Sequence, residues 1–248
     1  MCLVALALDA NACTPLTLAA NRDEYHRRPA DGAHRWRDRP HVLGGRDRRA
    51  GGTWLALGAA GRFAALLNCP GIAGPPQPPS RGQLVPAFLE TSDPDEWLAR
   101  LAAERARYAG FHLLAGHAGG VFLVGSDSPE PVRLTPGLHI VDNAGLASAT
   151  PRAQRAHTRL APLLEAGASP AALLAALGDR ADPPAGDGDR RPVFIADPVF
   201  GTRCSTVLRL FGTPWATAAL RERRYDASGQ CSGETSCVWP LGSPEAPP

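Results

Sequence analysis

Lysine is missing from this sequence, and all 26 of its basic side chains are arginine. The absence excludes enzymes that form a lysine Schiff base and phosphate-binding P-loops, which need their lysine. No apolar run approaches the roughly 20 residues that cross a bilayer, so we expect no stable membrane insertion. No basic segment precedes the first apolar run, so we expect no secretory signal. The net charge of +2 gives no reason to expect a nucleic-acid partner.

Cysteine is sparse, and its six positions form neither zinc-type CxxC pairs nor a dense disulfide framework. We therefore expect reduced thiols and a cytoplasmic location, with a Cys231–Cys237 bridge in an oxidising compartment as the alternative. The sequence has no CxxCH haem-attachment motif, and its seven histidines are scattered. We predict no metal site and no required cofactor.

What the sequence does contain is typical of a soluble globular protein, with 44% hydrophobic and 20% charged residues over 248 positions. A chain of this length can bury a substantial core. We predict a single domain over residues 1–240 and a flexible C-terminal tail over residues 241–248, where too few apolar side chains remain to pack.

Two short apolar runs near the start, residues 2–8 and 16–20, have strand length and predict a hairpin. An arginine-rich loop is expected over residues 25–49. A second hairpin is predicted within GGTWLALGAAGRFAALLN, residues 51–68. The proline- and glycine-rich segment 69–82 is expected to be a loop.

Helical patterns occupy two parts of the sequence. In TSDPDEWLARLAAERARY, Ser92 or Asp93 can cap a helix, and Pro94 fits its first turn. The apolar stripe of this helix predicts a core face and consists of Trp97, Leu98, Leu101 and Ala102. A second helical block is expected over residues 150–177, with a break near 167–170.

The remaining apolar runs predict strands at 110–116, 120–125, 138–143, 193–197, 205–212 and 213–220. The segment 179–191 is expected to be a mobile surface loop. Hairpins that alternate with helical blocks do not fit the regular alternation of a parallel sheet. We therefore predict an α+β protein, a four-layer αββα sandwich of two mainly antiparallel sheets covered by helices.

A cysteine at the second position could act as a nucleophile. If methionine aminopeptidase removes Met1, Cys2 carries both a thiol and a free α-amine. The amine titrates near ~7.7–8.0 and can accept the thiol proton, as in N-terminal threonine enzymes. Such a site also needs donors for an oxyanion and a carboxylate to hold the amine. The alternative is a buried cysteine of a core strand.

The polar cluster Asn21-Arg22-Asp23-Glu24 ends the strand that is expected to pair with the first one. The hairpin would place this strand end beside Cys2. Glu24 or Asp23 could then reach the amine of Cys2, while Arg22 offsets the crowded carboxylates. A solvated, salt-bridged strand end is the alternative interpretation.

Several longer motifs occur together, from the first residue to about residue 224. They are MC, LAANRDE, RP at Arg28-Pro29, GGTWL, AALLN, RGQLV, YAGFHLLAG, LTPGLHIVDNAGL and GTRCSTVL. In these motifs the sequence resembles the NRDE family, which is named for Asn-Arg-Asp-Glu and includes the transport and Golgi organization proteins. The resemblance implies an N-terminal nucleophile hydrolase-like fold, which agrees with the predicted order of elements.

A more distant resemblance is to the penicillin V acylase and bile-salt hydrolase group, which uses a second-position cysteine. It implies that Cys2 is the nucleophile, Glu24 the carboxylate that holds the amine, and Asn68 an oxyanion-hole residue. It also implies that Asn143 anchors the amine or substrate and that Arg203 lies near the nucleophile. The predicted substrate-binding residues are Asn21, Arg22, Asp23, Trp54 and His139.

Two main functions remain open from the sequence. The first is a cysteine amidohydrolase or thioesterase that cleaves a small amide or thioester through a covalent acyl-enzyme. The second, implied by the NRDE resemblance, is a non-catalytic carrier of haem or of a lipid or acyl chain that uses the same cleft. Arginines at 27, 28, 35, 37 and 39 could pair with propionates or phosphates, although a solvated loop also explains them. A purely structural scaffold is the third possibility.

Overall fold

The computed structural model describes residues 2–9, 14–146, 149–180, 192–212 and 215–241. The chain divides into two compact units, and it passes between them several times. Unit 1 consists of Met1–Arg28, Pro136–Thr213 and Ala218–Trp239. Unit 2 consists of Pro29–Thr135, Pro214–Thr217 and Pro240–Pro248. The prediction of a single domain over 1–240 stays a prediction, and residues 242–248 of the expected tail lie outside the described residues.

Unit 1 is built on a seven-stranded sheet with the order β11-β10-β1-β2-β12-β13-β14. The predicted N-terminal hairpin lies at its centre, where β1 pairs antiparallel with β2 and with β10, and β2 pairs antiparallel with β12. The strands are β1 (Leu3–Leu8), β2 (Leu16–Tyr25), β10 (Gly137–Asp142), β11 (Gly145–Leu146), β12 (Phe200–Phe211), β13 (Thr217–Tyr225) and β14 (Cys231–Pro240).

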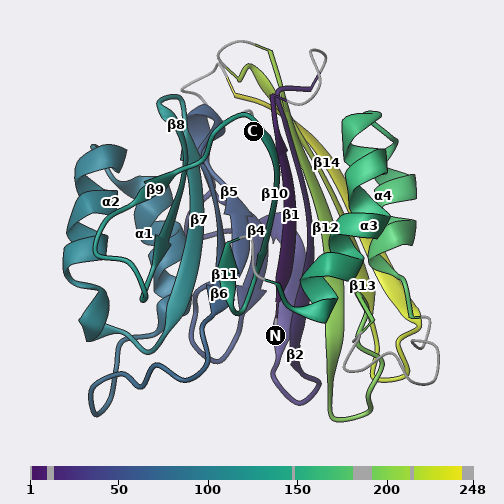
Figure 1. The fold of residues 1–248 in the computed structure, drawn as a ribbon, viewed down its shortest axis with the longest axis horizontal. Coiled ribbons are helices and arrows are strands. Elements are labelled where there is room, and N and C mark those ends of the chain that lie inside the picture. Colours follow the sequence, from purple (N-terminus) through teal and green to yellow (C-terminus); the bar gives the residue numbers. More distant parts are fainter. Residues whose placement is uncertain (1, 10–13, 147–148, 181–191, 213–214, 242–248) are drawn as a thin grey trace. The chain divides into compact units, whose positions relative to one another are not determined.

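Two helices cover one face of this sheet, α3 (Pro151–Glu165) and α4 (Pro170–Leu177), as Figure 1 shows. Thr150 caps α3 and Ser169 caps α4, each by accepting a backbone N–H bond, so the predicted helical block breaks between them. Alternate residues of β1 and β2 point toward these helices. They form a buried core that includes Leu3, Ala5, Ala19, Leu160 and Leu173.

Unit 2 contains a second seven-stranded sheet, whose strands follow the chain order from β3 to β9 and pair antiparallel throughout. The strands are β3 (Ala30–Arg35), β4 (Leu43–Asp47), β5 (Leu55–Leu57), β6 (Phe63–Asn68), β7 (Phe111–His117), β8 (Gly120–Gly125) and β9 (Val132–Arg133). The predicted hairpin of residues 51–68 is confirmed as β5 and β6, with a 3₁₀ turn at Ala59–Gly61 between them.

Helices α1 (Leu84–Glu90) and α2 (Pro94–Ala103) pack on the unit 2 sheet, against β5 to β8. Asp93 rather than Ser92 caps α2, because its carboxylate accepts the backbone N–H of Glu96 at 2.9 Å. The predicted stripe of α2 does face the core: Leu98, Leu101 and Ala102 are buried, and Trp97 packs against them. Short 3₁₀ turns at Arg81–Gln83 and Arg105–Arg107 precede and follow this helical pair.

The expectation of a loop over residues 25–49 is wrong, because β3 and β4 form a hairpin there. Arg35 and Arg46 lie on these strands. Arg46 pairs with Asp38, and Arg48, in the turn after β4, pairs with Asp31. Charged side chains on these partly buried strands hid the period-two pattern on which a strand prediction depends.

The expectation of a strand at 193–197 is also wrong. Val193 and Phe194 are buried, but they lie in an irregular segment whose backbone bonds to side chains and to α-helical ends. The apolar residues of this segment are buried without forming a strand, and their apolar pattern therefore misled the sequence prediction. Strand β14 was not predicted, because its alternation is mostly polar. The mobile loop predicted at 179–191 falls largely on 181–191, which lie outside the described residues.

Candidate functional site

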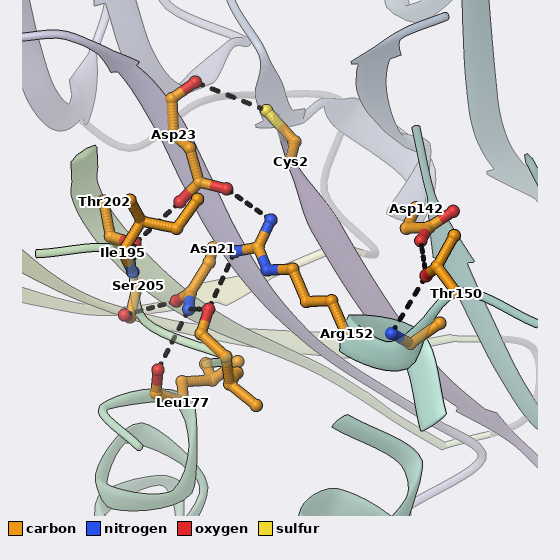
Figure 2. Close-up of polar contacts among 12 residues, drawn as sticks. Cys2, Asn21, Asp23, Asp142, Thr150, Arg152, Leu177, Ile195, Thr202 and Ser205 are labelled. Carbon is orange, nitrogen blue, oxygen red and sulfur yellow. Dashed lines mark hydrogen bonds and ion pairs between the residues drawn. The ribbon is translucent and has the colours of Figure 1, made fainter. Parts of the chain in front are cut away.

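Cys2 directly precedes β1, at the strand end where the polar cluster also lies. The pairing of Leu3 with Asn21 brings the thiol beside Arg22 and Asp23 of β2. The thiol of Cys2 donates a hydrogen bond to the backbone carbonyl of Asp23, with 4.0 Å between Sγ and O (Figure 2). The predicted adjacency of the second residue and the cluster is therefore present in unit 1.

Strand alternation divides the cluster between the two faces of the sheet. Asn21 and Asp23 point to the face covered by α3 and α4, while Arg22 and Glu24 point to the opposite face. The four residues therefore do not act as one group around the thiol. Two of them are anchored beneath the helices, and two form an ion pair on the other side.

The carboxylate of Asp23 is completely buried and is held by two partners. Arg152, in the first turn of α3, places Nη1 2.7 Å from Oδ2. Thr202, opposite Asp23 on β12, donates its hydroxyl to Oδ1 at 2.7 Å. Arg152 also donates to the carbonyl of Val193 at 2.7 Å. A buried charge is stable only when it is paired and hydrogen-bonded, and both conditions are met here.

Asn21 is only 1% exposed, and its amide bonds to the protein interior. Nδ2 donates to the carbonyls of Leu177 and Val193, at 2.9 and 3.1 Å. Oδ1 accepts the hydroxyl of Ser205 at 2.6 Å, and Ser205 in turn accepts the hydroxyl of Tyr225 at 3.2 Å. These bonds tie β2 to the end of α4 and to β12. The predicted role of Asn21 in substrate binding stays a prediction.

On the opposite face, Glu24 lies between two arginines. Its Oε2 is 3.9 Å from Nη2 of Arg22 and 3.7 Å from Nε of Arg28, and its Oε1 accepts the backbone N–H of Tyr25 at 2.9 Å. Glu24 is therefore occupied with guanidinium groups. Its predicted contact with the amine of Cys2 stays a prediction, because the described residues begin at Cys2.

Arg203 occupies an irregularity in the β2–β12 ladder. The register shifts between Thr202 and Cys204, so Arg203 is the extra residue of a β-bulge. The bulge turns its guanidinium back along β2, where Nη1 donates to the carbonyls of Tyr25, His26 and Arg28 at 3.0 to 3.2 Å. Burial, and then the charge of Arg22, lower the pKa of Arg203 below its usual range. Arg203 thus fixes the chain that follows the cluster.

Asn143 follows β10 and is buried in the turn that leads to β11. The preceding Asp142 organises this turn: Oδ1 accepts the backbone N–H of Ala144 at 2.8 Å, and Oδ2 accepts the hydroxyl of Thr150. Because Thr150 also caps α3, the turn with Asn143 and the helix with Arg152 are linked (Figure 2). His139 lies further along β10, opposite Leu6 of β1.

Asn68 and Trp54 belong to unit 2. Asn68 is the exposed last residue of β6 and pairs with Phe111 of β7. Trp54 precedes β5 and accepts the backbone N–H of Leu66 at 2.7 Å. Their predicted roles, an oxyanion donor and a substrate contact, stay predictions.

The thiols near the cluster ionise with difficulty. Burial, and then the negative charge of Asp23, raise the pKa of Cys2 above its usual value, although the amino terminus and Arg22 act in the opposite direction. Burial, and then the charge of Glu222, raise the pKa of Cys204 well above its usual value. A proton acceptor close to Cys2 would be required before this sulfur could attack a substrate at neutral pH.

Arg152, Thr202 and Ser205 were not predicted as part of this region. A signal for Arg152 was present, since a cation in the first turn of a helix opposes the helix dipole and needs a compensating partner. Alternation within Asn-Arg-Asp-Glu also places Asn21 and Asp23 on one face. Among the described residues, no three His, Cys, Asp or Glu side chains gather where they could hold a metal ion. In the same residues no helix is long and apolar enough to cross a membrane.

The fold is N-terminal nucleophile hydrolase-like, as predicted. A solved structure of the Caenorhabditis elegans N-acylethanolamine-hydrolyzing acid amidase ortholog matches with a TM-score of 0.51 over 84% of this chain and 92% of that chain. The identity is 10%, so the likeness concerns the fold alone. With two antiparallel sheets and two helix pairs, it confirms the predicted α+β sandwich class.

The chain belongs to the Transport and Golgi organisation 2 family, whose model matches residues 1–226. Homologues of that name in Mus musculus and Homo sapiens are 38% and 37% identical over 140 and 139 residues, each match covering 52% of this chain and 50% of the relative. The Drosophila melanogaster protein is 34% identical over 128 residues, 46% of this chain and 45% of that protein. The chain thus spans about half the length of the curated relatives it matches. The predicted family is confirmed.

Proposed function

We propose that this protein is an N-terminal cysteine hydrolase that cleaves a small amide or thioester. The observation that supports the proposal most directly is the position of Cys2, whose thiol lies just before the start of β1, against the carbonyl of Asp23. A nucleophile at the start of a central strand is held by the sheet on both sides. The likeness of the fold to an amidase, and the resemblance to the acylases, support the same chemistry.

The proposed reaction begins once removal of Met1 has freed the α-amine of Cys2. The amine accepts the thiol proton, and the sulfur attacks the acyl carbon. The carbon–nitrogen or carbon–sulfur bond then breaks, the leaving group takes the proton from the α-ammonium, and an acyl-enzyme thioester remains. Water, deprotonated by the same amine, hydrolyses the thioester and releases a carboxylic acid.

Because the pKa of the Cys2 thiol is raised, the proposed reaction needs a base close to the sulfur. Few thiolates would exist at neutral pH without it, because a one-unit rise in pKa lowers the thiolate fraction about tenfold. An amine that takes the proton during the attack avoids the need for a pre-formed thiolate. Retention of Met1 would remove this base, and the intact mass of the purified protein tests that condition directly.

The deciding experiment uses a panel of nitroanilides and acyl thioesters with the purified protein. We expect a burst of leaving group and an acyl adduct on the peptide that contains Cys2. Cys2→Ala should abolish both, whereas Cys69→Ala, which removes a partly exposed thiol of unit 2, should change neither. Turnover that survives in Cys2→Ala, or an adduct shared equally among the thiols, would contradict the proposal.

A non-catalytic carrier is the second candidate, and the raised pKa of the partly buried Cys2 favours it, since a protonated thiol is a poor nucleophile. The ligand would be haem or an acyl chain, and the location cytoplasmic. Of the five arginines considered as partners for its anionic groups, Arg39 already pairs with Glu90 and Arg28 with Glu24. A carrier should bind its ligand equally well with Cys2→Ala and with Met1 retained. A haem titration without any spectral shift would exclude the haem version.

A further inference from the structure

Asp23 connects the thiol of Cys2 with two more distant parts of unit 1. Asp23 holds the thiol through its backbone carbonyl, and its side chain is held by Arg152 and Thr202 (Figure 2). These partners lie about 130 and 180 positions away in the sequence, on α3 and β12. The residue that contacts the thiol is therefore anchored from α3 and from β12.

Several titratable groups act on the thiol of Cys2. Asp23 and Arg22 lie beside it on β2, and Cys204 of β12 interacts with it electrostatically. Asp23 is the carboxylate that opposes ionisation of the thiol, and Arg152 is the guanidinium in contact with that carboxylate. Coulombic effects of this kind weaken when a charge is neutralised by a partner at ion-pair distance.

We propose that Arg152 is a positioning residue for Cys2: it neutralises the buried carboxylate of Asp23 and thereby fixes the thiol in place and permits its ionisation. Arg152 does not touch the sulfur and acts through Asp23. The inference rests on the proposed function only for its effect on turnover, since the ionisation of the thiol is measured without a substrate.

The same helix supplies a matched control. Arg155, three residues after Arg152, forms a two-pronged ion pair with Asp179, with Nε and Nη2 at 2.6 and 3.2 Å from the two carboxylate oxygens. Its side chain is 14% exposed and that of Asp179 is 12% exposed. Loss of Arg155 therefore removes a comparable ion pair from the same helix without exposing Asp23.

The test is the rate at which iodoacetamide alkylates Cys2, followed by the mass of the N-terminal peptide between pH 6 and 10. In Arg152→Gln we expect the rate below the thiol pKa to fall about tenfold, which corresponds to a one-unit rise in pKa. Arg152→Lys keeps the charge and should stay within about threefold of the wild type. Arg155→Gln should match the wild type.

Asp23→Asn provides a second measurement that does not depend on the stability of Arg152→Gln. Thr202 can still donate to the amide oxygen, and the guanidinium of Arg152 then lacks an opposing charge, so alkylation should be faster than in the wild type. The double variant Asp23→Asn/Arg152→Gln should return to within about threefold of the wild-type rate. If Arg152→Gln does not fold, the direction of the change in Asp23→Asn decides.

The proposal is overturned if Arg152→Gln alkylates like Arg155→Gln, or if Asp23→Asn is slower than the wild type. A turnover assay distinguishes the failure of this proposal from the failure of the proposed function. Alkylation rates that respond as stated, in a protein that cleaves no acyl substrate, would sustain the role of Arg152 and end the hydrolase proposal. Turnover by the wild type with an unresponsive Arg152→Gln would do the reverse.

Discussion

Replacement of Asn21 by leucine should be among the most destabilising single changes in unit 1. Asn21 is 1% exposed and makes three hydrogen bonds, two to carbonyls and one from the hydroxyl of Ser205. Leucine has the same branched shape and number of side-chain heavy atoms but no polar atoms, so three buried partners lose a bond. At about 1–1.5 kcal/mol for each group left unpaired, the free energy of unfolding should fall by about 3–4.5 kcal/mol.

Urea unfolding monitored by circular dichroism and by tryptophan fluorescence would measure this loss. Ser205→Ala removes one of the three bonds and should cost about 1–2 kcal/mol, and Tyr225→Phe removes only the 3.2 Å bond to Ser205 and should cost about 1 kcal/mol or less. The order of the three variants follows from the geometry of the network. A loss below about 1 kcal/mol for Asn21→Leu, at an unchanged m-value, would refute the reasoning.

Three further changes test other parts of the structure. Asp93→Ala removes the cap of α2 and should cost about 1 kcal/mol, whereas Ser92→Ala should stay within about 0.5 kcal/mol in the same urea assay. The thiol of Cys204 has a pKa well above its usual value, so the folded state retains its proton above ~8.5, where the unfolded thiol ionises. The free energy of unfolding should therefore fall as pH rises past that point, and Cys204→Ala should flatten the slope. Hydrogen bonding to Arg46 lowers the pKa of Asp38 to about 2, and an NMR titration should find that midpoint in the wild type and a value near ~3.9 in Arg46→Gln.

Local patterns were sufficient where each signal lay within a few residues. The N-terminal hairpin, the cap and stripe of α2, and the break between α3 and α4 followed from alternation, capping residues and helical spacing. The same local rules failed for the hairpin of β3 and β4, because arginines and aspartates on these partly buried strands conceal their period. They also failed at Val193, which packs in the core of unit 1 while its carbonyl bonds to side chains and not to a neighbouring strand.

Only part of the candidate site could be predicted, because its residues lie far apart in the sequence. That Cys2 lies beside the end of β2 follows from a short hairpin. That Asp23 turns away from the thiol's face, toward Arg152, depends on a helix that begins more than a hundred residues later. The bulge at Arg203 likewise depends on how β12 meets β2. No local sequence pattern encodes how these two strands pair.

The central strand of unit 1 must wait for its second neighbour during synthesis. Strand β2 ends at Tyr25, while its partner β12 begins at Phe200. At about 5–20 residues per second, a ribosome needs roughly 10–40 s to make the intervening chain. Throughout that interval the β2 edge stays open to solvent and to chaperones. The newly made chain therefore passes through a period in which the β12 partners of the polar cluster, Thr202 and Ser205, are not yet in place.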